Sequence, residues 1–155
     1  MIRKSIQLCF LIGLISFSSI SGANGQKPDF LKWYSIGEAQ ELSELTNKDL
    51  LIFAVTEWCV YCKAMDRKAF KNSQIVTKIN DHFYPVRIDI ESDEAIIFNG
   101  EQMTEAQFAE QYDMNIPPKT LFLNQKGEVL FEYTGFISEE VFRQLLSAWQ
   151  KKKRI

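Results

Sequence analysis

The stretch DLLIFAVTEWCVYCKAM, residues 49–65, decides which fold this chain can adopt. Its first half is a continuous apolar run between polar residues, which is typical of a buried central strand, expected here from Leu50 to Thr56. Two cysteines, Cys59 and Cys62, follow at once. Apolar residues then recur at helical spacing, so we expect a helix that starts near Cys59 and bends near Asn72. The cysteines therefore lie where a buried strand is followed by a helix.

A cysteine pair with this spacing can be a redox couple, half of a metal site or a structural disulfide. A structural zinc ion needs about four ligands, yet the chain has one histidine, His82, and no second Cys-x-x-Cys pair. We expect His82 to be a surface or packing residue. A disulfide that closes so short a loop adds little stability, because the stabilisation grows with loop length. A redox couple is favoured, and the other two interpretations remain open.

The position of the pair predicts different roles for its two members. Unpaired N–H groups and the helix dipole stabilise negative charge at a helix start. We therefore expect the pKa of the Cys59 thiol to fall below its ordinary value of about 8.5. Cys62 lies one helical turn further, close enough to bridge to Cys59 and more deeply buried. These positions suit Cys59 to attack a substrate disulfide and Cys62 to resolve the mixed disulfide.

The N-terminal residues 1–23 have the features of a secretory signal peptide. A basic start is followed by an apolar run from Ile6 to Ile20 and then by small residues. A membrane anchor is the less favoured alternative, because a span needs about 20 apolar residues. Removal would take Cys9 away and leave one cysteine pair. We expect a periplasmic or otherwise exported protein, outside the thiol pool of the cytosol.

The remaining patterns predict alternating helices and strands. Ser35 and Glu38, and later Thr104 and Gln107, have the spacing of capping boxes that open helices. The other expected elements are a strand at residues 84–90, a possible hairpin turning at Asn99-Gly100, two strands within residues 116–135 joined by a turn at 124–127, and a last helix after Ser138. Strand–helix–strand units imply parallel strands with helices on both faces, and the final two strands add an antiparallel edge.

Length and composition favour one domain with extensions. The chain has 155 residues, 46% of them hydrophobic, and can build a sizeable core. Its net charge of -2 gives no reason to expect a nucleic-acid partner. We expect a signal peptide at 1–23, a flexible leader at 24–32, a globular domain at 33–150 and a solvated basic tail at 151–155.

Two stretches carry a resemblance to the thioredoxin superfamily: TEWCVYCK at residues 56–63 and NIPPKTLFL at residues 115–123. The chain is most similar to exported members, including the C-terminal domain of the membrane-spanning thiol reductase. The resemblance covers about Trp33 to Trp149. It implies a thioredoxin-like α/β fold, in which a central mixed sheet lies between helices on both faces in three αβα layers. It also implies a thiol-disulfide oxidoreductase that needs no cofactor and no metal.

The resemblance also assigns residues. Cys59 matches the attacking cysteine, Cys62 the resolving one and Trp58 the tryptophan that flanks the site. Pro118 matches the cis-proline that packs against the disulfide, although Pro117-Pro118 alone is also a plain turn signal.

The chain departs from the family pattern within the site itself. Phe53 stands where cytosolic members carry a buried aspartate that shuttles a proton, so Glu57 and Lys63 are the nearest ionisable groups that could assist. Pro117 precedes the cis-proline and has no N–H, so one hydrogen bond to the substrate backbone should be missing. Lys119 stands where threonine is usual and adds positive charge beside the site.

One further departure is the segment 94–103, which has the character of an insertion. It could form a rim near the site or a surface excursion, and the surface excursion is favoured.

The resemblance favours a reductant or electron carrier that acts on disulfides of exported proteins, with a membrane thiol reductase as a possible electron donor. Tyr61, beside the second cysteine, is also similar to periplasmic disulfide isomerases, so an isomerase or oxidase is the alternative. A non-enzymatic binding module with the same fold is another alternative. The protein is expected to be a monomer.

Overall fold

The computed structural model describes residues 30–153. The expected signal peptide and most of the expected leader lie outside these residues. The elements are, in chain order, α1 (Ile36–Thr46), β1 (Asp49–Val55), α2 (Val60–Arg67), the short 3-10 helix η1 (Ala69–Lys71), α3 (Ser73–His82), β2 (Phe83–Asp89), β3 (Ala95–Phe98), β4 (Glu101–Thr104), α4 (Glu105–Gln111), β5 (Lys119–Leu123), β6 (Val129–Thr134) and α5 (Glu139–Lys153). Within residues 30–153 no helix is long and apolar enough to cross a bilayer.

The helix expected after the cysteines is divided into three pieces. α2 ends at Arg67, η1 follows, and α3 begins after Asn72, whose side-chain oxygen accepts hydrogen bonds from the N–H groups of Gln74 and Ile75. The predicted bend at Asn72 is therefore an N-cap, the position that asparagine favours. The capping box at Thr104 and Gln107 is confirmed, with both reciprocal hydrogen bonds present.

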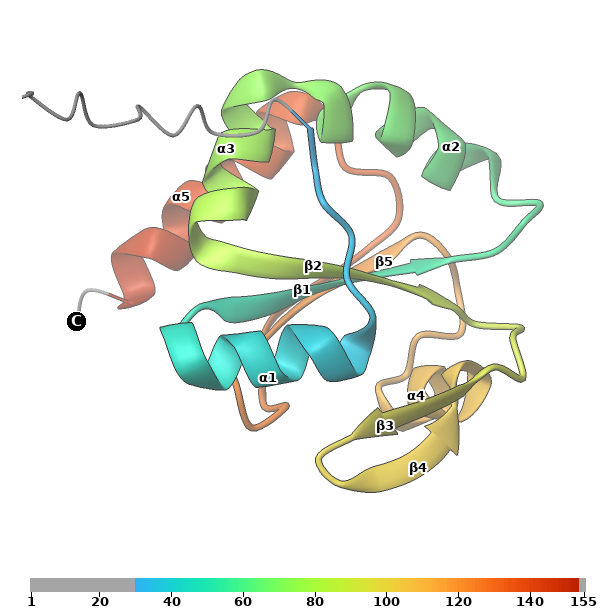
Figure 1. Ribbon diagram of the computed structural model, residues 1–155. Helices are drawn as coiled ribbons and strands as arrows, with labels where there is room; N and C mark the ends of the chain where they lie inside the picture. Colours follow the sequence, from blue (N-terminus) through green and yellow to red (C-terminus); the bar gives the residue numbers. More distant parts are fainter. Residues whose placement is uncertain (1–29, 154–155) are drawn as a thin grey trace, which may run out of the picture.

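Four strands form the central sheet in the order β2-β1-β5-β6 (Figure 1). β1 and β2 are parallel, as predicted, and pair from Asp49 opposite Phe83 to Val55 opposite Asp89. β5 is antiparallel to β1, so the parallel pairing expected for the second strand–helix–strand unit is wrong. The seven residues of α4 span only about 10 Å, less than half the length of a seven-residue strand. The chain therefore enters β5 at the same end of the sheet at which it left β2.

The sheet lies between two helical layers, as the predicted fold class requires (Figure 1). Side chains alternate along β1, so that Leu51 and Phe53 face one core cluster while Leu50, Ile52 and Ala54 face the other. The first cluster is completed by α2, α3 and α5, and the second by α1, α4 and the β3–β4 hairpin. Both cysteines belong to the first cluster.

Phe53 lies at the centre of an aromatic stack in the first cluster. It is fully buried, and its ring centroid is 4.9 Å from that of Phe70 and 6.1 Å from that of Trp33. Phe70 in turn contacts Phe142 edge to face at 5.7 Å. Each such contact adds about 0.5–1.5 kcal/mol beyond area burial. The position of the family's aspartate is therefore filled by a packed hydrophobic side chain.

The β3–β4 hairpin is confirmed, and it is a surface excursion. Its turn residues Asn99 and Gly100 both have positive φ, 52° and 79°, as a two-residue hairpin turn requires. Asn99 contacts Gln40 on α1 and donates to the carbonyl oxygen of Lys126 in the β5–β6 turn. Because that turn joins the ends of β5 and β6 opposite the cysteines, the hairpin tip points away from them.

Both ends of the domain are more firmly packed than predicted. Leu31 is buried in the first core cluster, so the packed domain begins within the leader expected at 24–32. At the other end, α5 continues to Lys153, whose ammonium group lies 2.8 Å from the carboxylate of the buried Asp49. Residues 151–153 are exposed, as expected of a solvated end, and the ammonium group of Lys153 is in addition paired.

Candidate redox site

Cys59 and Cys62 form a disulfide where β1 ends and α2 begins, with 5.3 Å between their Cα atoms. Cys59 is the N-cap residue of α2, and its N–H donates to the carbonyl oxygen of Thr56 at 3.2 Å. This hydrogen bond closes the turn between strand and helix. The pair thus lies at a helix start, as the sequence predicted.

The two sulfur atoms have opposite polar surroundings. The backbone N–H of Cys62 donates to Sγ of Cys59 at 3.1 Å. Sγ of Cys62 instead lies 3.9 Å from the carbonyl oxygen of Ala54. An N–H donor stabilises a thiolate, whereas a carbonyl oxygen favours a protonated thiol that can donate to it. In the reduced protein, this geometry suits Cys59 to be the thiolate and Cys62 the thiol.

Burial does not distinguish the two cysteines. Cys59 is 4% exposed and Cys62 is 3% exposed, so the predicted deeper burial of Cys62 is barely present in the disulfide form. The difference in polar contacts therefore separates their roles better than exposure does.

The Pro117–Pro118 peptide bond is cis, the geometry that the resemblance implied. Pro118 is buried, and its carbonyl oxygen accepts a hydrogen bond of 2.7 Å from the N–H of Gly135. The next residue, Lys119, pairs with Ala54 across β1 and β5. The proline therefore lies at the end of the sheet that carries the cysteines.

Trp58 is 63% exposed and is held by a residue that the sequence analysis missed. Its indole N–H donates to both carboxylate oxygens of Glu91, at 3.1 and 3.0 Å. Glu91 lies two residues beyond β2, and the end of that strand pairs with the end of β1 at Val55. The parallel pairing of the two strands was the signal that could have placed an acidic group here.

Large apolar side chains are exposed around the disulfide. Tyr61 is 64% exposed and its ring lies 6.2 Å from that of Phe136. We call the following set the apolar surface: Trp58, Val60, Tyr61, Ile116 and Phe136, each at least 36% exposed. Val60, Ile116 and Phe136 were not predicted, because a single apolar residue in a loop carries no sequence signal. An exposed apolar surface is typical of an interaction site.

The ionisable residues that were predicted to assist proton transfer make no polar contact with the cysteine sulfur atoms in the described part of the chain. Glu57 and Lys63 are both exposed, and within residues 30–153 neither side chain makes a hydrogen bond or ion pair. Lys119 is buried, and its ammonium group pairs with Glu132 rather than remaining open beside the site.

Two buried hydroxyl groups have no partner in the described part of the chain. They are Oγ1 of Thr56 and Oγ1 of Thr120. Thr120 lies directly opposite Phe53 in the β1–β5 register, so its side chain faces the same core cluster as the cysteines.

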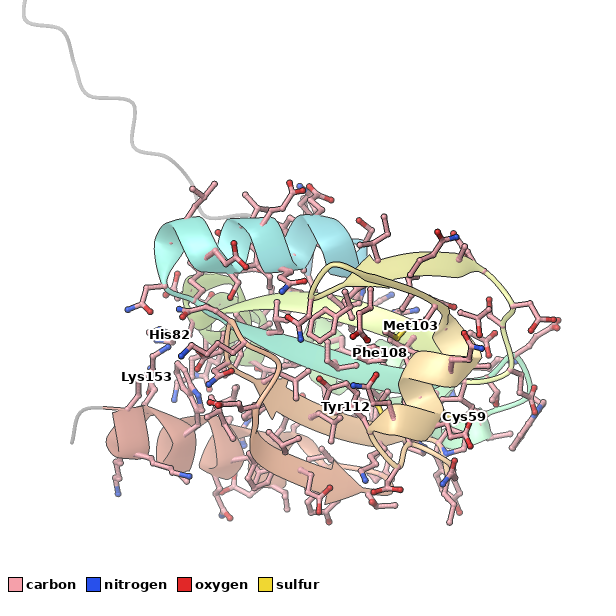
Figure 2. The ribbon with its side chains drawn as sticks, turned by 90° about the horizontal axis from the view of Figure 1, so that it is seen from below. Cys59, His82, Met103, Phe108, Tyr112 and Lys153 are labelled. Carbon is pink, nitrogen blue, oxygen red and sulfur yellow. A yellow bond between two sulfur atoms is a disulfide. The ribbon has the colours of Figure 1, made fainter. Side chains whose placement is uncertain are left out.

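His82 lies at the far end of the molecule from Cys59 (Figure 2). Its ring packs 5.3 Å from that of Trp149, and its Nε2 is 2.6 Å from the side-chain nitrogen of Gln150. It is a packing residue. Among residues 30–153 there is no group of three or more side chains suited to bind a metal ion.

A comparison with family models matches residues 36–150 to the thioredoxin-like domain family. No curated protein matches the chain. Among solved structures, the DsbH oxidoreductase is 22% identical with a TM-score of 0.63, and the match covers 84% of this chain and 95% of that one. The oxidised C-terminal domain of Neisseria meningitidis DsbD is 11% identical with a TM-score of 0.57, covering 77% and 98%.

A candidate disulphide-isomerase from Bacteroides thetaiotaomicron is 26% identical with a TM-score of 0.59, covering 77% of this chain and 93% of that one. The matches below 25% identity show the fold, and the family model covers nearly all of the described domain. The chain belongs to the thioredoxin-like domain family.

Proposed function

We propose that the protein is a thiol-disulfide oxidoreductase that reduces, or carries electrons to, disulfides of exported proteins. The observation that carries the proposal is the asymmetry of the cysteine pair. One sulfur atom accepts an N–H bond and the other faces a carbonyl oxygen, so the reduced pair has one favoured thiolate and one favoured thiol. The apolar surface around the pair supports docking of a protein substrate.

The proposed reaction transfers two electrons in two exchanges. The Cys59 thiolate attacks one sulfur atom of a substrate disulfide; a Cys59–substrate bond forms, and the other substrate sulfur leaves as a thiolate and takes a proton. The Cys62 thiol then loses its proton and attacks Sγ of Cys59, which releases the second substrate thiol and forms the Cys59–Cys62 disulfide. An external dithiol must reduce this disulfide before the next cycle.

The proton of Cys62 needs a route that differs from the one common in the family. Phe53 excludes a carboxylate from the core below the pair. Glu57 and Lys63 are exposed near the helix start, and we propose solvent at this edge as the proton acceptor, with these side chains assisting. Tyr61, Trp58, Pro117 and Pro118 are proposed to contact the substrate.

An isomerase is the second candidate. The 26% identity to the candidate disulphide-isomerase of Bacteroides thetaiotaomicron favours it, and the same cysteine asymmetry serves either reaction. An isomerase must leave the mixed disulfide time to rearrange, whereas a reductant resolves it quickly.

We also propose that the protein acts outside the cytosol as a monomer and receives electrons from a membrane thiol reductase. The signal-like residues 1–23 support the compartment. A compartment that lacks the cytosolic thiol pool requires such a donor if the pair is to work as a reductant.

Insulin reduction with dithiothreitol tests the proposed activity. We expect turnover by the wild type and loss of it in Cys59→Ser. Cys62→Ser is expected to accumulate mixed disulfides through Cys59, and trapping by Cys59→Ser instead would reverse the roles. A reduction potential near about −270 mV supports a reductant and one near about −120 mV an oxidant. Absence of any turnover would leave the binding-module alternative.

A further inference from the structure

The segment that carries the cis peptide is held by backbone hydrogen bonds at its two ends: the N–H groups of Asp113 and Met114 donate to Glu110 and Ala109, and the carbonyl oxygen of Pro118 accepts from Gly135. We call residues 113–118 the proline loop; it joins α4 to β5 and contains Ile116, which is 67% exposed on the apolar surface. Pro117 and Pro118 have no N–H, so two of its six residues cannot donate a backbone hydrogen bond. The loop begins at Asp113, which has a positive φ of 51°.

The side chain of Lys119 links the two ends of this loop. Its ammonium group donates to the carbonyl oxygen of Asp113 at 3.2 Å and pairs with the Glu132 carboxylate at 3.0 Å. The first contact joins the start of the loop to its end, and the second fastens both to β6. The Lys119 side chain is 8% exposed, whereas that of Glu132 is 63% exposed, so solvent weakens the ion pair more than the contact with Asp113.

Burying a lysine side chain costs more free energy than burying an apolar one. An ammonium group in the interior must be paired to offset its lost hydration, and an apolar side chain of similar volume often serves stability as well or better. The pairing found here therefore points to a role beyond packing. The two ends that it joins belong to the loop that carries Ile116 and Pro118.

We infer that Lys119 is a positioning residue for the proposed reaction. It closes the proline loop so that Ile116 and the cis-proline are held in place beside the Cys59–Cys62 pair. This inference rests on the proposed function, because it concerns how that site receives its substrate. Lys119 acts through the loop, and none of its recorded contacts is with a cysteine.

The chain contains a matched control at the opposite end of the molecule. Lys153 also pairs with a carboxylate, that of Asp49 at 2.8 Å, and also donates to a backbone carbonyl oxygen, that of Asn47 at 3.2 Å. Cys59 and Lys153 lie at opposite ends (Figure 2). Lys119→Met and Lys153→Met thus remove the same kinds of contact, near the site and far from it.

The test measures kcat/KM for insulin reduction in both methionine variants. We expect Lys119→Met to lower it by about tenfold or more, mainly through KM, because small displacements of positioning groups have effects of this size. Lys153→Met should stay within about twofold of the wild type. Lys119→Arg, which keeps the charge and donors, should recover most of the loss. The reduction potential of the cysteine pair should not change in any of the three.

Glu132→Gln provides a second comparison that keeps the lysine and serves if Lys119→Met does not fold. The Glu132 side chain is exposed, so solvent screens the ion pair and we expect a smaller loss of about threefold. An unchanged kcat/KM in both Lys119→Met and Glu132→Gln would overturn the inference. An equal loss in Lys153→Met would overturn it too, because the effect would then be general.

Hydrogen exchange separates this inference from the proposed function. The hydrogen-bonded amides of Asp113 and Met114 should exchange faster in Lys119→Met or Glu132→Gln than in the wild type, whether or not the protein reduces insulin. Unchanged exchange there refutes the positioning role of Lys119. If the variants exchange faster than the wild type but the wild type itself does not reduce insulin, the proposed reductase function is refuted and the positioning role of Lys119 in the loop is not.

Discussion

At the scale of single residues, Thr120 carries a hydroxyl group that should lower the stability of the folded protein. Its hydroxyl group is buried and has no hydrogen-bond partner among residues 30–153. A buried unpaired hydroxyl costs about 1–3 kcal/mol. We expect Thr120→Val, which keeps the shape, to raise the free energy of unfolding by about 1 kcal/mol in urea denaturation.

Ser43 provides the control for this prediction. Its hydroxyl group is equally buried but donates to the carbonyl oxygen of Lys48. Ser43→Ala should therefore lower the free energy of unfolding. A loss of stability or of insulin reduction in Thr120→Val would show that the hydroxyl group acquires a partner, with the reduced cysteine pair as the first candidate on the same face of the sheet.

The contact between Trp58 and Glu91 gives a second residue-scale prediction. Glu91→Ala removes the acceptor that fixes an exposed indole ring. A hydrogen bond to a charged group contributes about 1.5–3 kcal/mol when buried and less at an exposed site. We expect KM for insulin to rise by about three- to tenfold with little change in stability. Glu91→Gln keeps an acceptor and should stay near the wild type; an equal rise in both variants would assign the effect to charge.

How far the site could be predicted also depends on single residues. The cysteines are visible in the sequence because their spacing follows from one strand and one helix turn, whereas Trp58 and Pro118 were assigned by the resemblance to the thioredoxin superfamily. Glu91 and Phe136 are not visible, because each reaches its contact only through the packing of segments distant in sequence. Glu132 is not visible, because its pairing with Lys119 depends on the register of the β5–β6 hairpin. Phe53 is recognisable in the sequence as an apolar residue of the central strand, yet its stacking on Trp33 required the three-dimensional packing.

At the scale of elements, the first turn of α4 contains a carboxyl group, that of Glu105, with a raised pKa. Burial raises the pKa of Glu105 above its ordinary value, and the charges of Glu94 and Asp89 raise it further, although hydrogen bonds from the Asp89 N–H and Ser92 lower it. The folded state therefore holds this proton to higher pH than the unfolded state does. Stability from this group is complete below the unfolded pKa and is lost as pH rises through the folded pKa.

Glu105→Gln tests the direction in which this carboxyl group changes stability with pH. We expect the variant to gain stability relative to the wild type as pH rises from about 4 to 7, measured by urea unfolding at each pH. Glu140 is a control with the opposite sign, because hydrogen bonds from Arg143 and Gln144 and the Arg143 charge lower its pKa. Glu140→Gln should lose stability relative to the wild type as pH rises. The same trend in both variants would contradict the assignment.

Elements were predictable where local sequence decides them. The capping residue Thr104 and the Asn99-Gly100 turn act within a few residues, and the structure has them as expected. The bend expected near Asn72 is instead the start of a separate helix, which Asn72 caps. The direction of β5 was not predictable in this way. The direction of β5 depends on the short length of α4 and on the path of the chain through the β3–β4 hairpin. The expectation that β5 would run parallel to its neighbouring strand was therefore wrong.

At the scale of the whole molecule, Asp49 joins the start of β1 to the end of the chain. Its carboxylate is buried and accepts hydrogen bonds from the Trp149 indole at 2.9 Å and from the Lys153 ammonium group at 2.8 Å. The charge lies at the end of the sheet opposite the cysteines. Neither contact is visible in the sequence, because the two partners lie 100 and 104 positions from Asp49.

We expect Asp49→Ala to lower the free energy of unfolding by about 3 kcal/mol or more, because it leaves a buried indole N–H without its acceptor and separates a charge pair. Insulin reduction by the folded variant should be unchanged, since the site lies at the other end. Asp49→Asn keeps an acceptor for Trp149 and should lose less than Asp49→Ala. Lys153 is 37% exposed and can return to water, so Lys153→Met should lose least. This order, measured by urea unfolding beside the insulin assay, separates stability from function; a loss of activity in folded Asp49→Ala would show that the two ends of the sheet are coupled.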